Sequence, residues 1–85
     1  MNATRRKTDE IGRIDISYHA RLRAMQRLGV IERAADHIRE LLAKAQPIDD
    51  DRFPACRAYR CGDVTIVVDR AERVVQTVVT EVPGR

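Results

Sequence analysis

The sequence contains few aromatic residues and no long hydrophobic run. Its 85 residues include two tyrosines, one phenylalanine and no tryptophan. Proteins that hold several single-stranded bases stack them on aromatic side chains, so this composition excludes a stacking platform of that kind. No apolar run is long enough to span a membrane, and the pair Arg5-Arg6 precedes charged residues instead of the apolar region of a signal peptide. We therefore expect no membrane partner and a cytoplasmic location.

Cysteine is also scarce. Cys56 and Cys61 are the only two, and their odd spacing places them on opposite faces of an extended segment. A disulfide between them would need a bend, and a single Cys-x4-Cys pair is a poor zinc signal. The run Asp49-Asp50-Asp51 lacks the spacing of a calcium-binding loop. We therefore expect reduced thiols, solvated carboxylates, and no metal or other cofactor.

Basic residues exceed acidic residues, 16 to 13, and the sequence pI is near 9.3. Such a balance is compatible with a polyanionic partner. The candidate nucleic-acid contacts are basic residues of the tail and of the first helix: Arg5, Arg6, Lys7 and Arg21. Residues 1–12 show no apolar period and are interpreted as a flexible basic tail, or as an arm that touches nucleic acid. Residues 13–82 are long enough for a single domain and not for two.

A first helix is predicted over Tyr18–Leu28. Ser17 is a good N-cap because its hydroxyl can accept a hydrogen bond from an unpaired backbone N–H. Gly29 stands where a helix end favours the left-handed conformation. The stripe predicted to face the core consists of apolar residues at helical spacing: Tyr18, Leu22, Met25, with Ala24 and Leu28 beside them.

His19, Arg23 and Arg27 follow one another at intervals of four in this helix. Residues at that spacing project from the same side, and four residues rise about 6 Å. His19 and Arg23 can therefore touch one phosphate while Arg27 reaches a neighbouring one. Neutral imidazole is the form that a general base needs near pH 7.

A second helix is predicted over residues 31–45, where apolar residues recur with a helical period. Pro47 prevents further continuation, and residues 47–54 are predicted to form a loop. We expect the two helices, joined through Gly29, to form a hairpin over one core. His37 lies on the solvent face of this second helix and is assigned no role.

The last third of the chain is predicted to form β-strands. Residues 13–16 alternate polar and apolar side chains and are predicted to form a short strand before the first helix. Three further segments are predicted to be strands, the last two because they are rich in β-branched residues: 56–60, 64–68 and 74–80. One face of the middle strand is assigned to the helices: Val64, Ile66 and Val68. The predicted fold class is α+β, with a helical hairpin packed on a three- to four-stranded antiparallel sheet.

The run Ser17-Tyr18-His19-Ala20-x-x-Arg23-x-x-x-Arg27 resembles the Ser-x-His-Ala-x-x-Arg signature of a small bacterial and phage family of undefined function. Val74-Val75-Gln76-Thr77-Val78 is similar to that family's Val-Val-x-Thr-Val strand. The family is grouped with the barnase–EndoU–colicin–RelE superfold, whose members are mostly metal-independent ribonucleases and toxins. The resemblance therefore implies a RelE-like fold with a site at four positions: His19, Arg23, Arg27 and Thr77.

The first functional hypothesis is a metal-independent RNA-cleaving toxin. His19 takes the proton from a ribose 2′-OH, and Arg23 and Arg27 stabilise the charge that builds on the phosphate. Thr77 and Tyr59 are candidates to orient the phosphate, and Tyr59 also to protonate the leaving oxygen. The expected partners are RNA, free or on the ribosome, and an antitoxin or immunity protein.

Two alternatives remain open. The chain can be a non-catalytic binding module, such as a phage or mobile-element regulator that acts on a host protein or nucleic acid. It can also be a helix-turn-helix DNA reader, although the second helix offers Asp36 and Glu40 and no array of Asn, Gln or Arg for base edges. An exposed edge strand is in addition able to support a homodimer.

Overall fold

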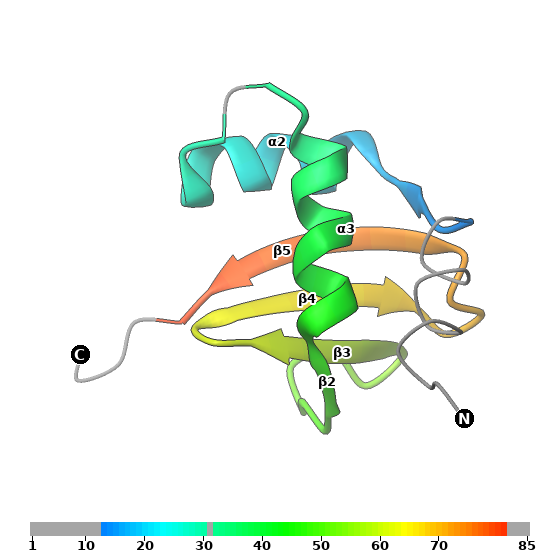
Figure 1. The fold of residues 1–85 in the computed structure, drawn as a ribbon. Coiled ribbons are helices and arrows are strands. Elements are labelled where there is room, and N and C mark those ends of the chain that lie inside the picture. Colours follow the sequence, from blue (N-terminus) through cyan, green and yellow to red (C-terminus); the bar gives the residue numbers. More distant parts are fainter. Residues whose placement is uncertain (1–12, 31, 82–85) are drawn as a thin grey trace, which may run out of the picture.

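Two helices and one five-stranded mixed sheet make up the structure, a computed structural model that describes residues 13–30 and 32–81 (Figure 1). The elements follow in the order β1 (Asp15–Ile16), α2 (Tyr18–Leu28), α3 (Ala34–Lys44), β2 (Gln46–Ile48), β3 (Cys56–Cys61), β4 (Val64–Asp69) and β5 (Val74–Thr80). The strands lie in the order β1-β5-β4-β3-β2. The α+β class is confirmed. The sheet is larger than predicted and not wholly antiparallel, because β1 pairs with β5 in parallel.

Both ends of α2 lie where the sequence predicts them. The Ser17 hydroxyl accepts a hydrogen bond from the backbone N–H of Ala20 at 3.0 Å, and Gly29 is left-handed with φ of 72°. The helix α3 begins later than predicted because Arg33 also has left-handed backbone angles, with φ of 58°, and provides no side-chain cap. Ile31, the expected first residue of that helix, lies outside the described residues.

Strand β2 occupies residues that were predicted to be loop. It pairs with β3, and Pro47 lies opposite Tyr59 in the register. Proline has no N–H to donate, so it is tolerated in a strand at the edge of a sheet, where one side has no partner strand. The short strand before α2 is confirmed at Asp15–Ile16, but its partner is β5, nearly sixty residues later.

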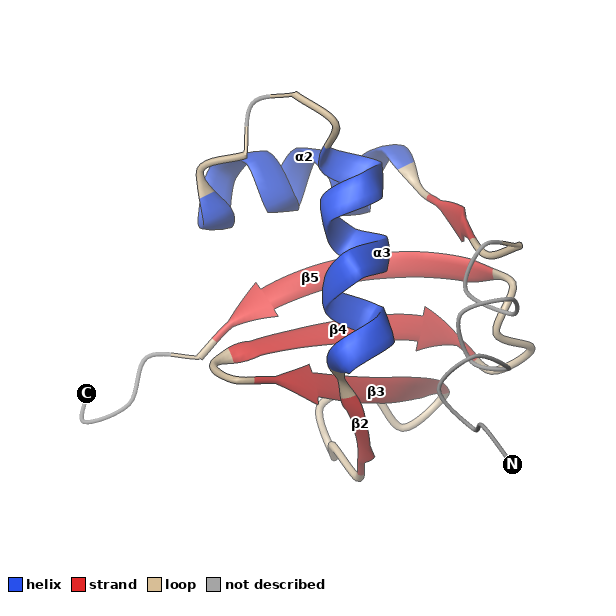
Figure 2. Ribbon diagram, in the orientation of Figure 1, coloured by secondary structure: helices blue, strands red, loops and turns tan. Residues whose placement is uncertain are grey.

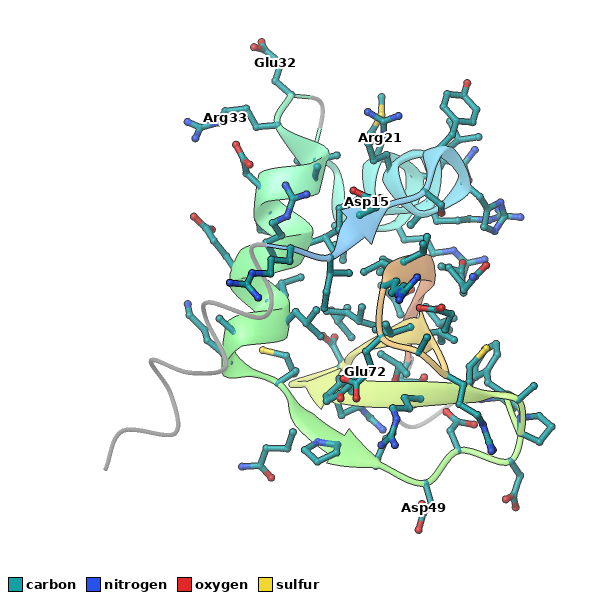
Figure 3. The ribbon with its side chains drawn as sticks, turned by 90° about the vertical axis from the view of Figure 1, so that its right-hand side faces the viewer. Asp15, Arg21, Glu32, Arg33, Asp49 and Glu72 are labelled. Carbon is teal, nitrogen blue, oxygen red and sulfur yellow. The ribbon has the colours of Figure 1, made fainter. Side chains whose placement is uncertain are left out.

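The core lies between the helices and one face of the sheet (Figure 2). The predicted face of β4 is confirmed, because Ile66 and Val68 are fully buried together with Ile38 of α3. The opposite face of β4 is buried as well, at Thr65 and Val67. In Figure 3 the loop that follows Asp49 passes on the side of the sheet away from α3. Strand β4 is therefore covered on both faces.

The predicted inward stripe of α2 is wrong at its centre, at Tyr18 and Met25, and right at its flanks, at Ala24 and Leu28. Ala20 and Ala24 are fully buried, whereas Tyr18 is 73% exposed and Met25 is 41% exposed. The helix packs against β5, and alanines on the packed side allow the two backbones to approach closely. Tyr18 and Met25 consequently lie on the outer side of α2, whereas Leu28 packs partly buried against the core.

The tail residues Arg5, Arg6 and Lys7 lie outside the described residues. Within residues 13–30 and 32–81, neither helix has the length and apolar character needed to cross a bilayer.

Candidate functional site

Hydrogen bonds to β5 hold the start of α2 in place. The backbone N–H of Ser17 donates to the carbonyl oxygen of Val75 at 3.2 Å, and its hydroxyl donates to the carbonyl oxygen of Gln76 at 3.3 Å. Just before them, the N–H of Asp15 donates to the carbonyl of Arg73 at 2.8 Å. The first turn of α2, which carries His19, is therefore fixed against a β-strand instead of lying on a free loop.

His19 and Arg23 are in contact on this helix. Arg23 Nε donates to His19 Nε2 at 3.5 Å, the long limit of a hydrogen bond, and Arg23 Nη1 donates to Gln26 Oε1 at 3.1 Å. His19 is exposed and Arg23 is half-buried. The four-residue spacing therefore brings the two side chains into contact, with the guanidinium as the donor and the imidazole as the acceptor.

None of the basic side chains of α2 is paired with a carboxylate among residues 13–30 and 32–81. The helix sequence YHARLRAMQRL contains three arginines and no acidic residue. Arg27 is exposed one turn beyond Arg23. Arg21 is exposed too, but it lies two residues from His19, which is about 200° around the helix. The positive charge of α2 is therefore uncompensated on both sides of the helix.

Thr77 and Tyr59 do not join the His19–Arg23 contact through any hydrogen bond in the described part of the chain. Thr77 lies opposite Val67 in the register, which turns it to the sheet face away from α3. Tyr59 lies in β3, two strands from β5 and thus about 10 Å away in backbone distance. Its hydroxyl donates to Glu72 Oε1 at 2.5 Å. The structure thus brings together the predicted base and one predicted cation.

A cavity of about 420 Å³ lies at the opposite edge of the sheet, beside β2 and β3, and was not predicted from the sequence. Tyr59 is the only predicted site residue among those that line it. The lining combines residues of β2 and β3 with the turn after β4: Pro47, Ile48, Asp49, Cys56, Arg57, Ala58, Tyr59 and Arg70. These residues meet only because β2 pairs with β3, a pairing that was not predicted.

A second group of charged residues surrounds Arg52. Its Nη2 lies 2.6 Å from Asp50 Oδ2 and 2.6 Å from Glu81 Oε2, and the Thr65 hydroxyl donates to the same Glu81 oxygen at 3.0 Å. The hydrogen bond from Arg52 lowers the pKa of Asp50 to about 2 and also lowers the pKa of Glu81. Asp50 is therefore bound to an arginine, and not simply solvated as predicted.

The described residues contain no group of three or more His, Cys, Asp or Glu side chains that could hold a metal ion. Cys56 and Cys61 are free and half-buried, as expected.

No protein family, no curated protein and no solved structure matches this chain.

Proposed function

We propose that this chain is a metal-independent ribonuclease that binds the RNA backbone with the basic side of α2. One observation supports it above all. His19 and Arg23 are in contact, Nε2 to Nε 3.5 Å, on a helix without acidic residues. A potential base and a fixed cation are thus adjacent, and nothing in the described part of the chain neutralises the cation.

Binding of RNA begins with the cations. A guanidinium holds a phosphate through two parallel hydrogen bonds, and these are stronger than a bond to a neutral acceptor. A phosphate therefore replaces the imidazole as the acceptor for Arg23, which leaves His19 Nε2 free to accept a proton. Arg27 lies one further turn along the helix, about 6 Å away, and contacts the next phosphate.

The chemical step needs no metal. His19 removes the proton of a ribose 2′-OH, the oxygen attacks the adjacent phosphorus, and the bond from phosphorus to the 5′-oxygen breaks. The products are a 2′,3′-cyclic phosphate and a 5′-OH, whose proton comes from water. Tyr59 is not the acid in this proposal because its hydroxyl donates to Glu72. Arg23 stabilises the charge that develops on the phosphate oxygens.

The placement of Thr77 and Tyr59 favours a second candidate. Because neither side chain bonds to the His19–Arg23 pair, the site holds fewer reactive groups than the sequence predicts. A non-catalytic module would use the same basic side of α2 to hold RNA or a host protein without cleaving it. The resemblance to RelE-like toxins supports the ribonuclease, and it adds an antitoxin or immunity protein as the expected partner.

The test is cleavage of a labelled single-stranded RNA by purified wild-type protein and two matched variants. We expect His19→Ala to slow cleavage about 10²- to 10⁴-fold, the usual contribution of a general base. His37→Ala, which changes the other histidine, should cleave like wild type. A chelator should have no effect on the rate, and the product should carry a cyclic phosphate. RNA that is bound but stays intact with wild type would identify a module that binds RNA without cleaving it. Absence of RNA binding would refute both the ribonuclease and such an RNA-binding module.

A further inference from the structure

We propose that Tyr18 stacks on an unpaired base beside the bound phosphate, so that the preferred ligand is single-stranded RNA. The inference rests on the proposed RNA-binding function of α2. It adds a substrate class, because a duplex offers no unstacked base to an aromatic ring.

The first support is the exposure of the ring. Tyr18 is 73% exposed, and only Met25 joins it as an exposed large hydrophobic side chain in the described part of the molecule. The other two aromatic rings are occupied, since Arg52 lies over Phe53 at 5.4 Å and Tyr59 packs against the core. Tyr18 is therefore the aromatic ring that a base can reach.

The second support is the position of Tyr18 on α2. It directly precedes His19, and neighbouring residues of a helix point about 100° apart. A base and the phosphate of the same nucleotide are separated by one ribose. A nucleotide can therefore span the side of the helix between Tyr18 and His19, passing over half-buried Leu22. The base then lies on apolar surface while the phosphate reaches the His19–Arg23 pair.

The third support is a cation on the other side of the ring. Arg21 follows Tyr18 by three residues and is its neighbour on the helix surface. Figure 3 shows that Arg21 points from α2 away from the sheet, and no carboxylate pairs with it in the described residues. A base on Tyr18 is thus flanked by positions for both of its phosphates, one at His19–Arg23 and the other at Arg21.

The positive charges of α2 also favour RNA over a second copy of the chain as the ligand of this surface. The exposed apolar patch is small, consisting of Tyr18, Met25 and part of Leu22. A second copy of the chain placed on the patch would bring like charges of two arginine-rich helices together. An anionic chain with flat apolar bases matches both the charge and the ring.

The experiment uses the fluorescence of tyrosine, because the sequence has two tyrosines and no tryptophan. In the Tyr59→Phe protein, Tyr18 is the only tyrosine. The ligand is an octamer of 2′-O-methyl adenosine, which cannot undergo attack by its own 2′-oxygen, tested as a single strand and as a duplex with its complement. We expect the single strand to quench the emission of Tyr18 and to bind more tightly than the duplex.

Three variants sharpen the result. Tyr18→Phe should keep the affinity, and Tyr18→Ala should weaken single-strand binding about 5- to 100-fold, the range measured for stacking on an aromatic ring. His37→Ala, which changes a side chain of α3 outside this patch, should bind like the wild type. Equal unfolding midpoints of these variants exclude a folding defect as the cause.

The outcomes separate the two proposals. Binding of the octamer without quenching, and with equal affinity for Tyr18→Ala and for the duplex, would overturn base stacking but leave the RNA-binding function intact. Absence of octamer and RNA binding by the wild type would overturn both. Emission that changes with protein concentration and not with RNA would assign the patch to self-association and also overturn the inference.

Discussion

Arg52 and Arg23 are both partly exposed arginines, yet their surroundings are opposite. Two carboxylates, each 2.6 Å away, bind the guanidinium of Arg52. The acceptors of Arg23 are a neutral amide and an imidazole, at 3.1 and 3.5 Å. A compensated arginine stabilises the fold that surrounds it, whereas an uncompensated one keeps its charge for a ligand. We therefore expect Arg52 to stabilise the fold and Arg23 to contact a ligand.

The position of the Arg52 group in the fold supports this division. It joins the loop between β2 and β3 to Glu81, the residue that follows β5. Glu81 also accepts from Thr65, which is buried in β4. Arg52 thus ties three parts of the chain together on the sheet face that the helices do not cover.

The largest expected effect is on RNA cleavage. Arg23→Ala should lower the cleavage rate about 10- to 100-fold, because the variant loses a charged hydrogen-bond donor to the phosphate. Arg52→Ala should cleave at the wild-type rate per folded molecule. The rates are measured with one labelled RNA, and the folded fraction by circular dichroism. Equal losses in the two variants would show that the division between them is wrong.

The next effect concerns stability and its dependence on pH. At neutral pH, Arg52→Ala should unfold at a lower urea concentration than wild type, and Arg23→Ala should not. The pKa of Asp50 is about 2 in the fold instead of 3.8, so this carboxylate contributes stability above pH 3.8 that is lost as the pH falls towards 2. The midpoint of wild type should therefore fall between pH 4 and 2, and Arg52→Ala should show a smaller fall. If the urea midpoints of the two proteins fell in parallel with pH, the structural role of Arg52 would be contradicted.

The smallest effect is on the salt dependence of binding. For single-stranded nucleic acid, each phosphate contact contributes about 0.7 to the slope of log K against log salt concentration. Replacing Arg23 by alanine should reduce the slope by about that amount, while Arg52→Ala should leave it unchanged. Titrations at several salt concentrations measure the slope, and the Arg52 variant is the matched control.

Local signals predicted α2 well. Ser17 and Gly29 determine where the helix starts and stops, because a capping hydroxyl and a left-handed residue act within one turn. The strands β4 and β5 were also predicted nearly residue by residue from their β-branched composition. The contact of His19 with Arg23 follows from helical spacing alone.

Features that depend on distant pairing could not be predicted in the same way. Pro47 predicts the end of the second helix and the start of a loop, and its strand exists only because β3 lies beside it. The outward direction of Tyr18 depends on the fit of Ala20 and Ala24 against β5, which hydrophobicity alone does not show. Thr77 turns away from α3 because of its register with β4, in which the pairing is irregular between Val67 and Val68.

The parallel pairing of β1 with β5 has a consequence for the order in which the protein assembles. The ribosome makes α2 well before it makes β5, the strand that receives this helix. Contacts across so many residues form slowly, because a long loop must close before they form. The helix with its basic side therefore leaves the ribosome before Val74–Thr80 and cannot dock until that strand has been made, so the proposed RNA site is completed only after β5.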